Sequence, residues 1–190
     1  RMGIEVLPPN INVSGHMFTV EQMAADRVPP RQTTAFPFPV EPGVAIRMGL
    51  DAIKNLGEGA VDVVLAARGD RPFALLADFA ERVDLRQINR RSLECLIKVG
   101  ALDDFAARPR LLAGIDGIMQ ASINSHVAAE VGQMTLFGEI EPATDGEILG
   151  PAGAGANISP KEILEWEKEL VGLYVSSHPL QRMTADLVNT

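Results

Sequence analysis

The 190-residue sequence holds one cysteine and three histidines, too few for a disulfide framework or a zinc site. Cys95 has no partner for an internal disulfide, and His16, His126 and His178 stand far apart in the chain. No run of about 18 to 20 apolar residues occurs, and the first residues lack the basic-then-apolar order of a secretion signal. The sequence therefore predicts a folded, cytoplasmic protein without a membrane segment, a structural metal or a redox centre.

Basic residues are also in the minority, with 17 against 25 acidic residues and a net charge of -8. The acidity is uneven along the chain. From Val44 to Leu112 there are 11 basic and 10 acidic residues, so this block carries +1 and the rest of the chain carries -9. The middle of the chain is thus electrically compatible with nucleic acid. Apolar residues make up 46%, enough to fill the core of one ordinary domain or two small ones.

Proline and asparagine shape the start of the chain. Residues 4–20 alternate apolar side chains with Pro, Asn and Ser, a pattern typical of a short strand or extended segment. Five prolines between Asp26 and Gly43 forbid a helix and predict a stiff loop. Because the sequence opens abruptly, without methionine in first place, we expect it to have been cut from a longer protein.

The middle of the chain predicts two helical pairs in tandem, because apolar residues recur at helical spacing between short Gly-rich or polar turns. The expected elements are a strand over residues 44–50, a short helix that Asp51 caps and Leu56 ends, helices over residues 60–68 and 73–82, and a helix from an Asn89 cap to Gly100.

The last part of the chain predicts two further helices separated by a linker. Pro109 is expected to open a longer helix that ends near Val131. Residues 138–158 are acidic and rich in Gly, Pro and Ala, which predicts a flexible linker. The sequence Ser159-Pro160-Lys161-Glu162 is a capping box and predicts the start of a final helix that reaches about Leu173.

These elements predict a mainly α fold. Its centre is a tandem helix-hairpin-helix domain, with a short extended or β segment before it and a linker plus helix after it. We expect four parts, which are residues 1–43, 44–112, 113–138 and 139–190.

The first candidate site is Leu56-Gly57-Glu58-Gly59-Ala60, between the first two helices. Such a hairpin can turn successive backbone N–H groups outward at the start of a helix, where the helix dipole favours an anion such as a phosphate. Glycine would permit close approach of a sugar-phosphate backbone and supply the positive φ that the turn is expected to need. A plain tight turn is the alternative, and the flanking apolar pattern favours the DNA-binding interpretation.

The second helical pair lacks paired glycines, but four arginines cluster near its turn: Arg82, Arg86, Arg90 and Arg91. They would either strengthen contacts to phosphates or form a solvated face, and both interpretations stay open. The residues that we assign to DNA binding are Lys54, Leu56, Gly57, Glu58, Gly59, Ala60, Arg86 and Arg90.

A third candidate is the pentapeptide Gln133-Met134-Thr135-Leu136-Phe137. Its Leu-Phe pair either folds back on its own domain or inserts into a pocket on a partner, and the local sequence alone favours the first. Asp103 and Asp104 are a weaker candidate for Mg²⁺, since no companion acid stands at a suggestive spacing. No catalytic residue or metal ligand is assigned.

The chain resembles a C-terminal portion of the bacterial DNA polymerase III alpha subunit, the C-family replicative polymerase, over nearly its whole length. Five segments in family order carry the resemblance: Ile4 to Asn12, Gly49 to Gly59, Leu96 to Asp103, Gln133 to Gly138 and Gly172 to Leu180.

The resemblance implies a non-catalytic part of a polymerase. The first 43 residues would end the fingers region, residues 44–112 would hold duplex DNA, and Gln133 to Phe137 would bind the ring-shaped sliding clamp. The tail would lead toward an oligonucleotide-binding fold. The palm carboxylates that bind catalytic Mg²⁺ in this family would lie upstream, and other replicase subunits would bind the full-length protein. An error-prone alpha-like polymerase and a free-standing helix-hairpin-helix adaptor are the alternatives.

Overall fold

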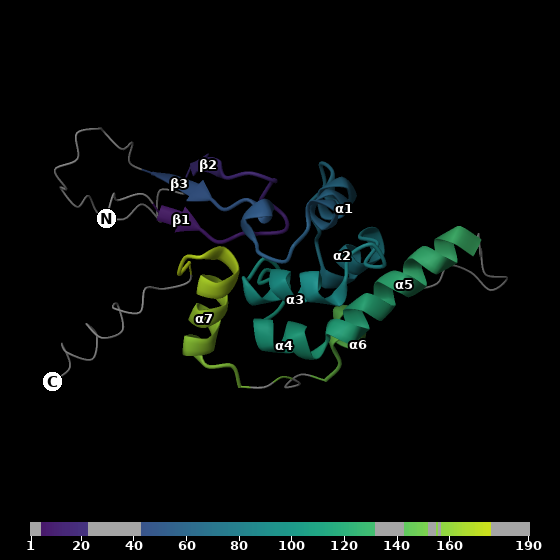
Figure 1. Ribbon diagram of the computed structural model, residues 1–190. Coiled ribbons are helices and arrows are strands. Elements are labelled where there is room, and N and C mark those ends of the chain that lie inside the picture. The colour runs from purple at the N-terminus through teal and green to yellow at the C-terminus, as the bar shows by residue number, and fades with distance from the viewer. Residues whose placement is uncertain (1–4, 23–42, 132–142, 152–154, 156, 176–190) are drawn as a thin grey trace, which may run out of the picture.

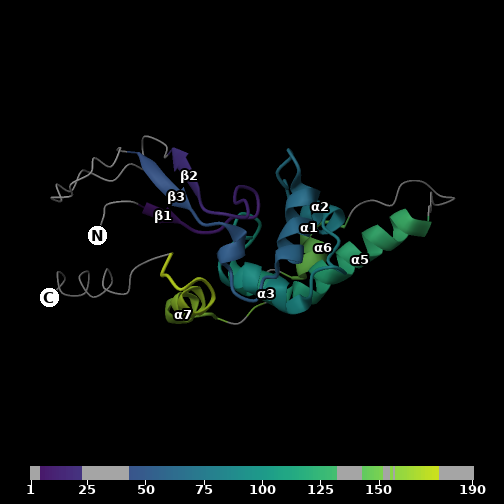
Figure 2. The ribbon, with the colours of Figure 1, turned by 45° about the horizontal axis from the view of Figure 1, so that its top comes forward.

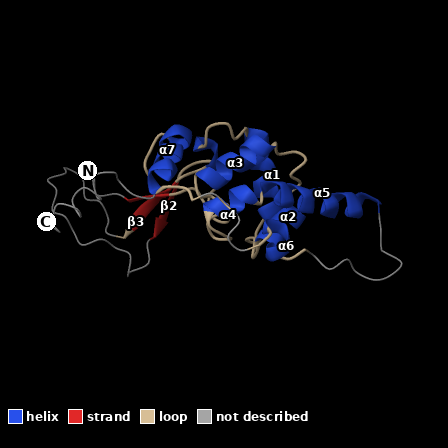
Figure 3. Ribbon diagram, turned by 90° about the horizontal axis from the view of Figure 1, so that it is seen from below, coloured by secondary structure: helices blue, strands red, loops and turns tan. Residues whose placement is uncertain are grey.

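The computed structural model describes residues 5–22, 43–131, 143–151, 155 and 157–175 (Figure 1). These residues are mostly helical with a small sheet at one end, as the sequence predicts (Figure 3). The strands are β1 (Glu5–Leu7), β2 (Thr19–Gln22) and β3 (Val44–Arg47). The helices are the 3-10 turn η2 (Leu50–Ala52), α1 (Glu58–Arg68), α2 (Leu76–Arg82), α3 (Arg90–Lys98), α4 (Arg108–Ala113), α5 (Ile115–Val131), α6 (Asp145–Leu149) and α7 (Pro160–Val171).

The three strands pair in the order β1-β3-β2, so the last strand lies in the middle. β1 runs parallel to β3 with Val6 opposite Ile46, and β2 runs antiparallel with Val20 opposite the same residue. The expected extended segment at the start of the chain therefore supplies the two edge strands. The strand expected over residues 44–50 is confirmed for its first four residues, after which the chain passes into η2 and the first hairpin.

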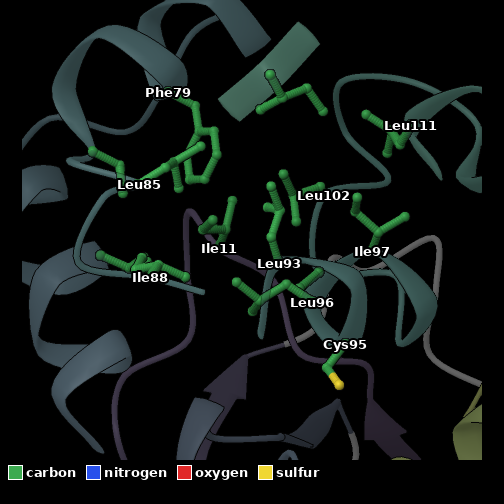
Figure 4. Close-up of a cluster of buried hydrophobic side chains, with 14 of the residues drawn as sticks. Ile11, Phe79, Leu85, Ile88, Leu93, Cys95, Leu96, Ile97, Leu102 and Leu111 are labelled. Carbon is green, nitrogen blue, oxygen red and sulfur yellow. The ribbon is translucent and has the colours of Figure 1, made fainter. Parts of the chain in front are cut away.

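One apolar core joins the helices, and Figure 4 shows its side chains pointing toward one another. Phe79 and Leu96 are fully buried in it. Ile11, from the loop between β1 and β2, is fully buried in the same core, and Leu170 of α7 is only 5% exposed. Full burial of such a side chain contributes about 1.5–3 kcal/mol. The division of the chain into four parts stays a prediction, and described residues from all four of these parts share this core.

The polar caps of two helices are confirmed. The Asn89 side chain accepts the N–H of Ser92 at 2.8 Å and so starts α3. At the start of α7, the Ser159 hydroxyl accepts the N–H of Glu162 at 3.2 Å, and the Glu162 carboxylate accepts the N–H of Ser159 at 2.8 Å. Gly100, predicted to end α3, has φ of +83°. Each is a signal that the local sequence alone supplies.

Three helix boundaries differ from the prediction. α1 begins at Glu58, two residues earlier than expected, so Gly59 is part of the helix. α2 begins at Leu76, three residues later than expected. The helix expected from Pro109 to Val131 is two helices, α4 and α5, which meet at Gly114.

The predicted role of Asp51 as a helix cap is wrong. η2 is a single 3-10 turn, and Gly49 occupies its N-cap position without a side-chain cap. A Cβ at Gly49 would lie 2.2 Å from the carbonyl oxygen of His16, because the loop before β2 lies against this residue. That loop also accepts the N–H of Leu50 through Gly15 O at 2.9 Å, so a long-range backbone contact replaces the expected cap.

The prediction of a flexible linker over residues 138–158 is wrong for residues 143–151, which contain α6. Thr144 starts α6 with a capping box that sequence inspection overlooked. Ile148 and Leu149 are then buried against the other helices, at 6% and 4% exposure. Two adjacent apolar residues are a weak sequence signal, so the helix is decided by packing.

α6 docks closely on the helical pairs. A Cβ at Gly117 of α5 would lie 2.1 Å from the carbonyl oxygen of Ile148, so only glycine permits this approach. The Asp145 carboxylate accepts the N–H groups of Leu76 and Ala77 at 3.3 and 2.8 Å. α2 therefore receives its N-terminal cap from a residue 68 positions further along the chain.

Lowering the pH should fray the start of α7. Hydrogen bonds from the backbone N–H and the hydroxyl of Ser159 hold the pKa of the Glu162 carboxyl below its ordinary value. Because the folded pKa is lowered, the cap stabilises α7 above the unfolded pKa of about 4.3 and loses its effect as the pH falls through the folded pKa. We expect the amide protection factor of Ile163, measured by NMR, to fall in that range in the wild type.

A matched pair of variants tests this cause. Glu162→Gln should lose the acid-dependent step, whereas Glu165→Gln, a change at an exposed position of the same helix, should keep it. A step that survives in Glu162→Gln would assign the fraying to another group.

Candidate nucleic-acid interface

The first hairpin, residues 53–59, begins with a tight turn. The N–H of Leu56 donates to the carbonyl oxygen of Ile53 at 3.3 Å, and Asn55, the third residue of the turn, has φ of 64°. Within the described part of the chain, Asn55 is the one non-glycine residue with positive φ, so Lys54 is not left-handed. A positive φ at the third residue alone is the geometry of a type II turn. The Lys54 side chain is exposed on this turn.

Three backbone N–H groups are open at the start of α1. Gly57 occupies the N-cap position without a side-chain cap, and the N–H groups of Ala60 and Val61 both donate to its carbonyl oxygen. No acceptor among the described residues takes the N–H of Gly57, Glu58 or Gly59, and all three residues are exposed. The helix dipole adds partial positive charge at the same place, which makes the arrangement suited to an anion.

The two glycines leave open space in front of these N–H groups. A Cβ at Gly57 or at Gly59 would meet no heavy atom within 4 Å, so internal packing does not require glycine at either position. The expectation that they supply positive φ is wrong, because Gly57 has φ of -70° and Asn55 takes the left-handed conformation instead. The lack of a side chain therefore matters only for what approaches from outside.

Two residues assigned to DNA binding from the sequence have side chains that face the core. Leu56 is 7% exposed and Ala60 is 9% exposed, so their side chains attach the hairpin to the core and do not reach a ligand. Glu58 is exposed in the first turn of α1, where its charge favours the helix but would repel a phosphate. Of the assigned side chains near this turn, Lys54 has both the exposure and the charge for a phosphate contact.

The second hairpin, residues 83–89, connects α2 to α3, and the start of α3 lies against the first hairpin (Figure 2). Ser122 of α5 is fully buried, and its hydroxyl accepts one backbone hydrogen bond from this hairpin at 3.0 Å and donates another at 2.6 Å. Ser92, in the first turn of α3, donates from its hydroxyl to the carbonyl oxygen of Asn55 at 3.1 Å. The start of α3 is therefore adjacent to the turn that precedes α1.

Arg86 and Arg90, assigned to phosphate binding from the sequence, are paired within the domain. The Arg86 guanidinium lies 2.8 Å from a carboxylate oxygen of Asp84 and 2.7 Å from one of Glu130. The hydrogen bond from Arg86 holds the pKa of the Asp84 carboxyl well below its ordinary value. Arg90 pairs with carboxylates of α3 and α5. A phosphate would have to displace these partners, so the assignment stays a prediction.

Arg82, in the same arginine cluster, is structural. Its guanidinium donates to three backbone carbonyl oxygens of residues 67, 68 and 71 at 2.7 to 2.8 Å, at the C-terminal end of α1. It also lies over the Phe73 ring, 4.6 Å from the ring centroid. Arg91, by contrast, is exposed in the first turn of α3.

His16 lies beside the first hairpin, and sequence reasoning missed it. Its Nδ1 lies 3.1 Å from a carboxylate oxygen of Asp51 in η2, and its Nε2 lies 3.2 Å from one of Asp62 in α1. His16 therefore links η2 and α1, the elements on either side of the hairpin. The carboxylates of Asp51 and Asp62 lie together on this side of the hairpin. No sequence signal reveals the contact, since both partners are more than 30 positions away.

The other sites considered from the sequence are a metal site, the Asp103-Asp104 pair and the clamp-binding pentapeptide. No group of three or more metal-ligating side chains occurs among the residues that the structure describes. Asp103 pairs with Arg108 at 2.9 Å, and Asp104 accepts a hydrogen bond from the Asn10 side chain at 2.8 Å.

In the described ranges, no helix is long and apolar enough to cross a membrane. The predicted clamp-binding residues Gln133 to Phe137 lie outside the described residues.

Comparison with known proteins relates the chain to one group. It is 34% identical over 182 residues to the DNA polymerase III subunit alpha of Thermus aquaticus, a match that covers 95% of this chain and 13% of that protein. The corresponding protein of Haemophilus influenzae is 35% identical over 98% of this chain and 14% of its own length, and that of Campylobacter jejuni is 36% identical over 96% and 14%. The chain thus spans about one seventh of the length of these curated relatives.

The homology is consistent with the fold, since the family model described as a helix-hairpin-helix motif matches residues 3–112. That range includes the three strands, both hairpins and α1 to α3. Because the match covers more than half of the chain, the protein belongs to the helix-hairpin-helix motif family and is a homologue of bacterial DNA polymerase III alpha subunits.

Proposed function

We propose that this chain is a non-catalytic, duplex-DNA-binding and sliding-clamp-binding region of a bacterial replicative DNA polymerase that acts in the cytoplasm. The observation that carries the DNA-binding part is the group of three open backbone N–H groups at residues 57–59. They stand at the positive end of α1, behind a surface that the two glycines leave clear. A phosphate oxygen is a good ligand for such an arrangement, since backbone N–H groups read no base sequence.

Binding of this kind is weak and independent of sequence. The hairpin offers one phosphate site, and exposed basic side chains such as Lys54 and Arg91 offer others. With about two to four phosphates neutralised, the logarithm of the affinity falls against the logarithm of the salt concentration with a slope of roughly -2 to -4. The acidic flank formed by Asp51 and Asp62 keeps the electrostatic contribution small.

The proposed clamp contact rests on the sequence Gln133 to Phe137 and on homology to DNA polymerase III alpha subunits. In this proposal Gln133 anchors through its side-chain amide, and Leu136 and Phe137 fill an apolar pocket on the clamp. Two weak contacts on one chain keep the polymerase on its template, because the loss of one contact leaves the other to restore it. Nucleotide incorporation, with its Mg²⁺ ions, belongs to other parts of the full-length protein.

Gly59→Asp tests the DNA-binding proposal. The substitution adds a side chain and a negative charge where the phosphate is proposed to lie, and we expect duplex affinity to fall by about tenfold at low salt. The free energy of unfolding should not fall, because an acidic side chain in the first turn of a helix is favourable. Fluorescence anisotropy with a labelled duplex measures the affinity.

Gly146→Asp is a matched control for this experiment. Gly146 is the second residue of α6, as Gly59 is of α1, and it is exposed, so the substitution adds the same charge at the same helical position away from the hairpin. It should leave duplex affinity within about twofold of the wild type. Equal affinities of the two variants would show that the hairpin is only a turn.

A further inference from the structure

The turn of the first hairpin is held from two sides by residues outside the hairpin. The N–H of Lys54 donates to the carbonyl oxygen of Leu170 in α7 at 2.8 Å. The carbonyl oxygen of Asn55, the next residue, accepts the hydroxyl of Ser92 in α3 at 3.1 Å. Asn55 is left-handed, a conformation that is unfavourable for a residue with a side chain. The two hydrogen bonds thus flank the strained position of the turn.

The hydrogen bond between the hairpin and α7 satisfies one backbone group of each: the N–H of Lys54 and the carbonyl oxygen of Leu170. Leu170 lies in the last turn of α7, which ends at Val171, so its carbonyl oxygen has no donor further along the helix. The Lys54 N–H lies outside any helix or strand, and Leu170 O is its acceptor. The Leu170 side chain is 5% exposed in the core, which fixes the position of its carbonyl group.

A buried ion pair fixes α7 itself. Glu167 is fully buried, and one of its carboxylate oxygens lies 3.2 Å from a guanidinium nitrogen of Arg108 in α4. Its other oxygen accepts the N–H of Val175 at 2.8 Å, just after the end of the helix. Arg108 also pairs with Asp103, so the charge of Glu167 is embedded in a network. Such a network is specific in geometry, since a shift of α7 would leave buried charges without their partners.

We propose that α7 positions the first hairpin for phosphate binding, with the Leu170 carbonyl group as the positioning group and the Lys54 N–H as its target. The inference rests on the proposed DNA-binding function and extends it. The matched motif ends at residue 112, whereas α7 begins at Pro160, so the hairpin depends on a segment beyond the motif. Without this contact the turn relaxes, and the three N–H groups of residues 57–59 no longer converge on one phosphate.

Two substitutions at Lys54 separate this contact from the lysine charge. Lys54→Ala removes the ammonium group and keeps the N–H, whereas Lys54→Pro removes both. Proline suits this turn, because it favours the second position of a type II turn and Ile53 before it is extended, with φ of -82° and ψ of 115°. We expect Lys54→Pro to bind a labelled duplex about fivefold more weakly than Lys54→Ala, the effect of one lost hydrogen bond.

A variant of α7 completes a double-mutant cycle. Glu167→Ala removes one of the carboxylate partners of Arg108 and the acceptor for Val175 N–H, and so loosens α7. In that background the two Lys54 variants should bind the duplex equally, because no contact is left for the proline to break. A difference that persists would place the effect in the turn itself and overturn the proposal, as would equal affinities in the wild-type background.

A measurement on the unsubstituted chain checks the coupling independently of how the variants fold. If docking of α7 favours the duplex, then the duplex favours docking of α7 by the same factor. Saturating duplex should therefore slow amide hydrogen exchange across residues 163–170 about fivefold, a change that a merely structural helix would not show. If the duplex binds clearly but the exchange rates stay unchanged, the proposed role of α7 is overturned while the proposed DNA-binding function stands. Absence of duplex binding by the wild type would instead refute the proposed function.

Discussion

Phe79→Ala should lower the free energy of unfolding by about 3–5 kcal/mol. Phe79 of α2 is fully buried and points into the core (Figure 4), where it also contacts two other rings. The Phe73 ring is edge-on at 5.3 Å between centroids, and the Phe105 ring is tilted at 6.2 Å. Truncation to alanine leaves a cavity that these rings cannot fill without losing contacts with the rest of the core. Urea denaturation followed by circular dichroism should show a lower midpoint with an unchanged slope.

Phe18→Ala is the matched control for this change. Phe18 is 51% exposed in the loop before β2, so the same truncation removes little buried surface. It should change the free energy of unfolding by no more than about 0.5 kcal/mol. If Phe79→Ala lowers the free energy of unfolding by less than twice the amount that Phe18→Ala does, the helical pairs do not share the single core described above.

The helical pairs could be predicted because their signals are local. Asn89 and Ser159 cap α3 and α7 as their sequences indicate, since a cap needs only a side chain and an N–H three residues later. Helix boundaries set by tertiary contacts could not be predicted. α2 begins at Leu76 because Asp145, far along the chain, accepts the N–H groups there. Nothing within ten residues of Leu76 supplies that information.

The first hairpin was located correctly in the chain, but its geometry was predicted only in part. The Gly-Glu-Gly sequence marks the hairpin, and α1 starts there. The left-handed residue was expected at a glycine and is Asn55, because asparagine tolerates this conformation better than other residues with side chains. The hydrogen bonds that hold the turn come from Ser92 and Leu170, which are distant in sequence. A pattern of residue types contains no signal for such contacts.

The arginine cluster shows the same limit for charged groups. Charge and spacing left open whether Arg86 and Arg90 contact phosphates or form a solvated face, and the folded chain brings Glu130 and Asp116 of α5 to them. α5 lies more than 25 positions further along the chain, so sequence inspection near the turn could not show the pairing. Exposed pairs of this kind are weak, about 0–1 kcal/mol, which leaves exchange of a carboxylate for a phosphate energetically accessible.

Replacing Leu136 and Phe137 together with alanine should weaken binding to a bacterial sliding clamp by well over tenfold. Burial of each side chain in a pocket on the partner contributes about 1.5–3 kcal/mol before ordering costs, and the substitution removes both contributions. The melting temperature should stay unchanged, because the proposal assigns these residues to the partner and not to the core. Surface plasmon resonance with immobilised clamp measures the affinity, and differential scanning calorimetry measures the melting temperature.

Met17→Ala with Phe18→Ala is the matched control for this double substitution. These two adjacent apolar residues are 70% and 51% exposed, so their removal tests whether any loss of exposed apolar surface weakens capture by the clamp. The control should bind the clamp like the wild type. The opposite pattern, a large fall in melting temperature for Leu136→Ala with Phe137→Ala and unchanged clamp affinity, would mean that the pair packs inside this domain. The local sequence alone favours that arrangement, so the double substitution decides between homology and local pattern.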